Sequence, residues 1–224
     1  MKRIEVLLTL SFILITSCNA VTPTTAPSVL TLEYTPATSP WMADIYACSG
    51  TTLIKADQMT ASLQDPLGAD FVLRLGASSV TTPAYQIGTD EIMVIVNPAN
   101  LVHLLSSTQV LGLFTGQIQD WQEIGGSDSP VQIWAYASSD DIQSVFDQIA
   151  LGGNEPASTA RLAAGPQEML QAIAADKNAV GILNARLIAN SVTRASTVTS
   201  VPVLVLTASS LPETSEDILA CLQH

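Results

Sequence analysis

Basic side chains are scarce in this sequence: it has 8 Lys and Arg against 20 Asp and Glu, and its formal net charge is -12. A surface of that sign repels nucleic acid and anionic lipid headgroups, so we expect no nucleic-acid partner. Histidine occurs only as His103 and His224. The sequence also lacks H-E-x-x-H, G-x-S-x-G and a cysteine pair at metal-binding spacing. These absences argue against an enzyme and predict neither a metal site nor a cofactor.

A long apolar run occurs only at the N-terminus, where two basic residues precede the stretch from Val6 to Ile15. This stretch is shorter than the ~20 residues that a bilayer-spanning helix needs, so we interpret residues 1–17 as a signal peptide. The segment Ile15-Thr16-Ser17-Cys18 matches a bacterial lipobox. We therefore expect lipidation of Cys18 and an extracytoplasmic protein, anchored to the bacterial cell membrane by lipid alone. An ordinary cleaved signal or an uncleaved anchor is the alternative.

The next segment, residues 18–29, is rich in Thr, Pro and Ala and has no hydrophobic periodicity. Such a composition cannot bury enough surface to fold, so it predicts a flexible tether. Two cysteines remain for the folded part, Cys48 and Cys221, and each closes a short helix-like stretch. Outside the cytoplasm they can form a disulfide, or they can be two buried thiols that never meet. The sequence does not supply the Cα separation that decides between these alternatives.

Strand-like and helix-like segments alternate along the rest of the chain. Hydrophobic residues make up 47% of the sequence and charged residues 12%, which excludes a disordered chain. The alternation predicts an α/β fold with a largely parallel sheet. The clearest strands are expected at 30–35, 69–76, 91–100, 130–136, 179–183 and 200–206.

Three of the expected strand–helix connections are short turns with hydroxyl side chains. They are Thr38-Ser39, Ser78-Ser79 and Ser138-Ser139. In open α/β sheets, ligands bind beyond the carboxyl ends of the strands, where helix N-termini present unpaired N–H groups. The three turns therefore predict a polar ligand pocket. The alternative is that each serine or threonine only caps a helix or closes a turn.

One basic residue, Arg74, lies within an otherwise apolar expected strand. It can anchor an anionic ligand or pair with a carboxylate of the protein. Pairing is favoured, because a buried arginine almost always has a partner. Aromatic residues near the same turns can stack on a ligand, although core packing is their commoner role; they are Trp41, Tyr85, Trp134 and Tyr136.

A more specific pattern occupies residues 91–126. It contains Val96-Asn97-Pro98, then Phe114-Thr115-Gly116-x-Ile118-x-x-Trp121, then Gly125-Gly126. This order of motifs resembles the phosphate-type substrate-binding proteins of ABC importers, which have the periplasmic-binding-protein-like type II fold. NAVGIL at 178–183 is similar to the return strand of that family.

The resemblance implies two lobes with mixed, mostly parallel sheets joined by two crossing strands. Lobe I is expected at 30–92 plus 191–224 and lobe II at 93–190, with the crossing strands near 91–97 and 180–190. It further implies a monomer that binds a small molecule, closes around it, and delivers it to an ABC permease. The six hydroxyl residues of the three turns are the ligand-binding residues that the resemblance implies.

The chain departs from the family pattern at two of the three turns. The usual G-A-S-D is Gly76-Ala77-Ser78-Ser79 here, so the acceptor carboxylate is missing. The usual R-x-x-G-S-G-T is replaced at 135–141 by a segment that ends in Asp140-Asp141. Two carboxylates neutralise the roughly +0.5 charge of a helix N-terminus, which weakens phosphate binding there. The ligand is thus a phosphate-like oxyanion or another small polar solute. A surface sensor or protein-interaction module with a degenerate ligand pocket is the alternative.

Overall fold

The computed structural model describes residues 28–59, 68–76, 82–207 and 213–223. The predicted signal peptide, Cys18 and nearly all of the predicted tether lie outside the described residues, as do Ser78 and Ser79. Within the described ranges, no helix combines the length and the apolar character that a membrane crossing requires.

The described strands form one mixed sheet in the order β2-β1-β3-β8-β4-β7-β5-β6. Parallel pairs lie toward its two ends, where β1 pairs with β2 and β3, and β5 pairs with β6 and β7. The central strands β4 and β8 are antiparallel to each other and to their outer neighbours. The bounds are β1 Val29–Tyr34, β2 Leu53–Gln58, β3 Phe71–Leu75, β4 Ala84–Val96, β5 Gln132–Ala135, β6 Arg161–Leu162, β7 Ala179–Asn184 and β8 Thr193–Leu206.

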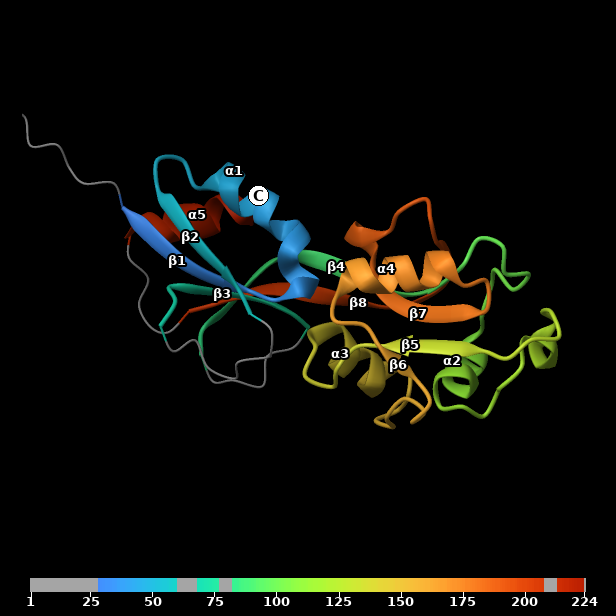
Figure 1. The fold of residues 1–224 in the computed structure, drawn as a ribbon. Coiled ribbons are helices and arrows are strands. Elements are labelled where there is room, and N and C mark those ends of the chain that lie inside the picture. Colours follow the sequence, from blue (N-terminus) through green and yellow to red (C-terminus); the bar gives the residue numbers. More distant parts are fainter. Residues whose placement is uncertain (1–27, 60–67, 77–81, 208–212, 224) are drawn as a thin grey trace, which may run out of the picture.

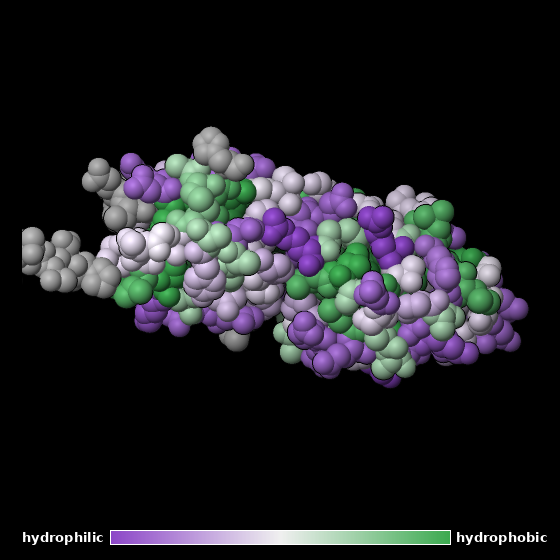
Figure 2. Space-filling model, turned by 90° about the horizontal axis from the view of Figure 1, so that it is seen from above, coloured by the Kyte–Doolittle hydropathy of each residue, from purple (hydrophilic) through white to green (hydrophobic). Residues whose placement is uncertain are grey.

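Strands β4 and β8 run through the middle of the molecule and join its two halves (Figure 1). Their pairing extends from Ala84 opposite Leu206 to Val96 opposite Thr193, with three register irregularities. The molecule is elongated along this pair, and Figure 2 shows the same long outline from above. We call β1–β3 and the helices beside them the first lobe. The second lobe contains β5–β7 and the helices beside those strands.

The second crossing strand is not where the sequence predicted it. Residues 180–190 contain most of β7, which pairs only with the Ile92–Val96 end of β4 and with β5. A six-residue strand reaches about 20 Å, too little to cross between lobes, whereas the 14 residues of β8 reach about twice as far. Because both lobes hydrogen-bond to the same two strands, their sheets form one continuous sheet.

Helices cover both lobes of this sheet (Figure 1). In the second lobe, α4 packs on β7 and β5; in the first, α1 lies against α5. The 3-10 turns are η1 Pro36–Trp41, η2 Trp121–Ile124 and η3 Ala185–Leu187, and the α-helices are α1 Met42–Cys48, α2 Ser107–Phe114, α3 Asp141–Ile149, α4 Pro166–Ala175 and α5 Glu213–Leu222.

The motif residues at 96–121 have structural roles in the second lobe. Asn97 donates through Nδ2 to the carbonyls of Ile173 and Ala174, and so satisfies the C-terminal end of α4. Trp121 is buried and donates from Nε1 to the Asn178 carbonyl at 2.9 Å. Phe114, also buried, packs edge-on against another ring of the core. The motif therefore positions α4 and the core.

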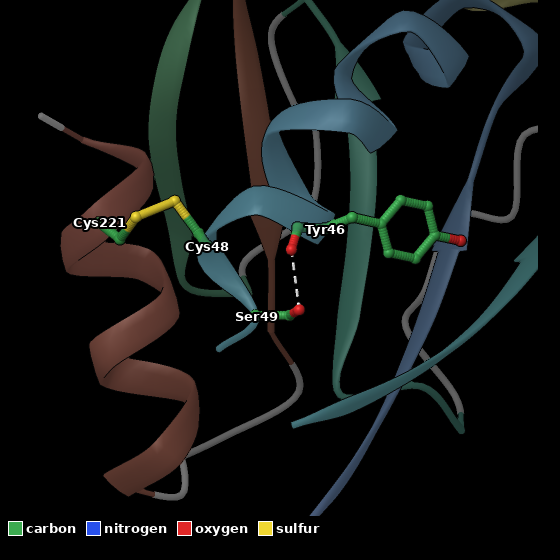
Figure 3. The surroundings of a disulfide bond; sticks show 4 residues. All are labelled: Tyr46, Cys48, Ser49 and Cys221. Carbon is green, nitrogen blue, oxygen red and sulfur yellow. Dashed lines mark hydrogen bonds between the residues drawn. A yellow bond between two sulfur atoms is a disulfide. The ribbon is translucent and has the colours of Figure 1, made fainter. Parts of the chain in front are cut away.

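A disulfide joins Cys48 at the end of α1 to Cys221 in α5, with their Cα atoms 5.7 Å apart (Figure 3). The structure thus decides between the two alternatives for these cysteines. Beside the bond, Ser49 Oγ donates to the Tyr46 carbonyl and closes the end of α1 (Figure 3).

Candidate functional site

A cavity of about 330 Å³ lies between the two lobes, at the carboxyl ends of parallel strands. Thr35 directly follows β1, Met59 follows β2, Tyr136 follows β5 and Ala163 follows β6. Parallel strands place their carboxyl ends at one edge, which is where open α/β sheets bind ligands. The complete lining among the described residues is Thr35, Pro36, Met59, Tyr136, Ala137, Ser139, Asp140, Asp141, Ala163 and Ala164.

At this cavity, a carboxylate of the second lobe binds a group of donors from the first lobe. Arg74, on β3, donates from Nη2 to Asp141 Oδ1 at 2.6 Å and from Nε to both carboxylate oxygens at 3.0 Å. The Leu75 backbone N–H donates to Asp141 Oδ2 at 3.1 Å, and the Thr35 hydroxyl donates to the same oxygen at 3.3 Å. The side chain of Asp141 is 3% exposed and that of Arg74 is 19% exposed. The prediction that Arg74 pairs with a carboxylate of the protein is confirmed.

The neighbouring Asp140 has a different environment, although it also lines the cavity. It is the N-cap of α3, and its Oδ1 accepts from the backbone N–H groups of Ile142 at 2.8 Å and Gln143 at 3.4 Å. Burial raises the pKa of Asp140 from 3.8 to about 6, and the charge of Asp141 adds to the rise. The two backbone hydrogen bonds and Arg74 oppose it.

Tyr136 forms a fixed wall of the cavity. Its hydroxyl donates to the Ile182 carbonyl at 3.1 Å, and its backbone N–H donates to Oε1 of Gln143 at 2.8 Å. Burial raises the pKa of Tyr136 well above 10, and the charge of Asp140 contributes to the same direction. The phenol is therefore neutral, and its hydroxyl already has a partner inside the protein.

The predicted first turn shapes the cavity without lining it. The Thr38 hydroxyl is buried, accepts from the Thr35 backbone N–H at 3.0 Å and donates to the Thr35 carbonyl at 3.1 Å. Ser39 Oγ donates to the Pro36 carbonyl at 2.9 Å. Both side chains therefore stabilise η1, and the residues that reach the cavity are Thr35 and Pro36.

The third predicted turn contributes one of its two serines. Ser139 lines the cavity, whereas Ser138 is exposed and is not among the lining residues. Ser78 and Ser79 fall outside the described residues, so their role stays a prediction. The sequence interpretation did not select Thr35 or Met59. The available signal for Thr35 was its position as the last residue of the strand expected at 30–35. Met59 directly follows β2 in the structure.

A second group of contacts ties the lobes together beside the cavity. The Arg186 guanidinium carbon lies 3.5 Å from the Trp41 ring centroid, and its Nη1 pairs with Asp44 at 2.7 Å. Asn184 is buried and donates from Nδ2 to the Ala37 carbonyl and to Asp90. Trp41 is thus packed between protein groups and does not line the cavity.

Another cavity, of about 440 Å³, lies wholly within the second lobe. Its described lining contains no charged side chain and no residue of the first lobe, so it is not placed where the lobes meet. The lining is Thr115, Gly116, Ile118, Gln119, Pro130, Val131, Ile133, Ala157, Ser158 and Thr159. In the described part of the chain, no group of three or more His, Cys, Asp or Glu side chains is arranged to hold a metal ion.

Comparison with known proteins identifies a family and several solved structures with a similar fold. Residues 80–220 match the model of the PBP superfamily domain. A stretch of 73 residues is 32% identical to the phosphate-binding protein PstS of Bacillus subtilis (strain 168), covering 33% of this chain and 24% of that protein. The match therefore spans about a quarter of the length of this curated relative.

Solved structures resemble the whole described fold. A phosphate ABC transporter substrate-binding protein with bound phosphate, from Clostridium perfringens, has a TM-score of 0.79 at 18% identity, covering 87% of this chain and 93% of that chain. An ABC-type phosphate transport receptor from Vibrio cholerae has a TM-score of 0.68 at 20% identity, with coverage of 87% and 93%. The OxyR2 regulatory domain from Vibrio vulnificus has a TM-score of 0.64 at 8% identity, covering 88% of this chain and 95% of that chain. At these identities the likeness shows the fold alone, and it confirms the predicted fold class.

Proposed function

The chain belongs to the PBP superfamily, and on that premise we propose that it is an extracytoplasmic solute-binding lipoprotein that captures a small polar ligand for an ABC importer. The observation that carries this proposal is the cavity between the lobes, lined from both sides at the carboxyl ends of parallel strands. A ligand there contacts both lobes at once, so its binding favours the closed arrangement. The protein acts by binding and release, without catalysis.

The remaining parts of the proposal rest on the sequence. Cys18 is the lipidated residue, residues 18–29 tether the folded part to the membrane, and the partner is an ABC permease. We propose the lobe division at 30–92 plus 191–224 and at 93–190, and a monomer in solution. Of the predicted ligand residues, Ser139 is the one whose described position supports direct contact; Ser78 and Ser79 are retained as proposed contacts.

The experiment is a thermal-shift and calorimetry screen of the purified protein against amino acids, polyols, organic cations and oxyanions. A ligand at 100 times its dissociation constant stabilises the folded state by about 2.7 kcal/mol. Ala137 lines the cavity and is exposed, so Ala137→Trp fills the space without removing a hydrogen bond. We expect this variant to lose the ligand response. Ala47→Trp, at an exposed position of α1, is the matched control and retains it.

A second function is favoured by one specific observation, the carboxylate of Asp141 that already binds donors of the first lobe. A protein whose lobes are held together from within can act as a surface sensor or interaction module that has kept the fold. A screen in which no solute stabilises the protein, or one in which Ala137→Trp responds like the original chain, would favour this second function over solute capture.

A further inference from the structure

The donors that surround Asp141 are of the types that proteins use to bind oxyanions. They comprise one guanidinium edge with two N–H donors, a backbone N–H and a hydroxyl. Arginine suits carboxylate and phosphate because its planar fork donates two parallel hydrogen bonds. All these donors come from the first lobe, from Thr35 after β1 and from Arg74 and Leu75 on β3. They converge on one carboxylate of the second lobe.

This carboxylate has a permanent advantage over an anion in solution. It is covalently held at the first turn of α3, so its effective concentration at the donors is that of an intramolecular group. It is also 3% exposed, which leaves little space for a second anion beside it. A free oxyanion has to displace Asp141 and bury that charge without its partners, which is strongly unfavourable.

The rest of the cavity offers no compensating positive charge. Among its described lining residues there is no Lys, Arg or His, and Asp140 adds a second carboxyl group. Anions therefore meet repulsion at this site, whereas a neutral or cationic solute does not.

We propose that Asp141 is a built-in anion: its carboxylate occupies the oxyanion-binding donors of the first lobe, holds the two lobes together and makes the cavity select a neutral or cationic ligand. This inference deepens the proposed function and rests on it for the identity of the cavity as the ligand site. The occupation of the donors by Asp141 is a property of the protein alone, and it is tested without the natural ligand.

The test replaces Asp141 by smaller side chains and supplies the anion from solution. Asp141→Ala and Asp141→Ser are titrated with inorganic phosphate, sulfate and acetate, by calorimetry and by the shift in Tm. We expect both variants to have a lower Tm than the original chain. We also expect phosphate and sulfate to raise the Tm of the variants, with an affinity at least about 100-fold above that of the original chain, because the anion regains charge-assisted hydrogen bonds. Acetate should restore part of the lost stability, since it returns the missing carboxylate.

Asp147→Asn is the matched control, because it removes a carboxylate from the same helix and leaves the donors to Asp141 in place. We expect it to respond to phosphate no more than the original chain does. Equal phosphate binding by the original chain and the Asp141 variants would overturn the inference, as would folded variants that bind none of the three anions. Variants that do not fold in the presence of any of the three anions would overturn it as well, because the removal of Asp141 would then not have left an anion-binding site.

These outcomes separate the inference from the proposed function. If the Asp141 variants gain phosphate binding while the original chain binds no solute at all, the built-in anion stands, and solute capture fails together with the ligand selection that depends on it. If the original chain itself binds phosphate in the cavity, solute capture stands and the built-in anion is wrong.

Discussion

Adjacent carboxyl groups at the start of α3 show how strongly position decides the state of a side chain. Asp141 accepts hydrogen bonds from a guanidinium, a hydroxyl and a backbone N–H, and so its charge is compensated. Asp140 is one residue away, yet it accepts hydrogen bonds from N–H groups of its own helix and is half-buried at the cavity. Burial disfavours the ionised form of Asp140 by more than its two backbone hydrogen bonds and the charge of Arg74 favour it. The protein therefore compensates the charge of Asp141 far more than that of Asp140.

Asp140 should make the protein less stable as the pH rises. Its pKa is about 6 in the folded protein against 3.8 ordinarily, so between these values the folded protein holds a proton that the unfolded chain has released. The stabilisation that this proton gives the folded state is fully present below pH 3.8 and is lost as the pH rises through about 6. We expect Asp140→Asn, which retains an N-cap side chain, to be more stable than the original chain at pH 7 by on the order of 1–2 kcal/mol.

Urea unfolding across the acid-to-neutral range checks this expectation, with the difference between variant and original chain as the measured quantity. That difference should shrink toward zero or reverse at low pH, where Asp140 is protonated. Ser139→Ala, a change at the exposed neighbour on the cavity wall, should leave the pH profile as it is. A difference between Asp140→Asn and the original chain that is the same at every pH would contradict the assignment.

The strand β3 of the first lobe and the helix α3 of the second lobe contact each other, and a glycine at the end of β3 allows their close approach. Gly76 follows β3 with a φ of +90°, and a Cβ built there would lie 2.7 Å from Cγ2 of Val145 on α3. Gly76→Ala should therefore destabilise the fold by about 1–3 kcal/mol from backbone strain, with an added cost from the contact. Gly50→Ala, also at positive φ but in open space, should pay the backbone cost alone.

The double variant Gly76→Ala with Val145→Ala separates the two causes. Removing the Val145 methyl groups relieves the contact, so the two changes should be less harmful together than the sum of their separate costs. Denaturant unfolding of the four proteins gives the interaction free energy. Strict additivity would show that α3 does not press on the end of β3.

How far the elements could be predicted depended on whether their signals were local. The strands after Val29 and Phe71 and the buried β7 carry apolar runs or alternation, and they lie where the sequence placed them. The first half of β8 carries no such signal, because its side chains are mostly half-exposed or exposed and its partner β4 is distant in sequence. The sequence accordingly predicts a strand that begins at residue 200, seven residues after the first residue of β8, and it predicts the crossing between lobes near 180–190, where β7 lies.

The site was predictable only in outline for the same reason. Its location at strand ends follows from topology, and the pairing of Arg74 follows from the cost of burying a charge. The identity of its partner does not, since 67 residues separate Arg74 from Asp141 along the chain. The Thr38 hydroxyl also illustrates the limit: a capping role and a ligand role use the same residue type, and only its bonds to Thr35 distinguish them.

For the molecule as a whole, the contacts between lobes differ in strength. The Arg186–Asp44 pair is 40% and 46% exposed, and exposed pairs stabilise by about 1 kcal/mol or less. The Arg74–Asp141 pair and the amide of Asn184 are buried, and breaking a buried pair by removing one member costs far more. Asp141 lines the cavity, so one of the strong contacts that hold the lobes together is located where a ligand would act on it.

The disulfide stabilises a different part of the molecule, the two helices α1 and α5 of the first lobe. It joins α1 to α5 across 173 residues, and none of the described cavity residues belongs to either helix. Closing so long a loop restricts the unfolded chain, so the double variant Cys48→Ser with Cys221→Ser should lose about 2–5 kcal/mol of unfolding free energy. Urea unfolding followed by tryptophan fluorescence measures this loss. Reductant should lower the unfolding midpoint of the original chain to that of the variant and leave the midpoint of the variant unchanged.

Because the bond and the cavity are separate, the variant should keep the affinity of the original chain for any solute found in the screen. A midpoint that does not move on reduction, or a solute affinity lost together with the bond, would show that α5 is held, or the cavity supported, in another way.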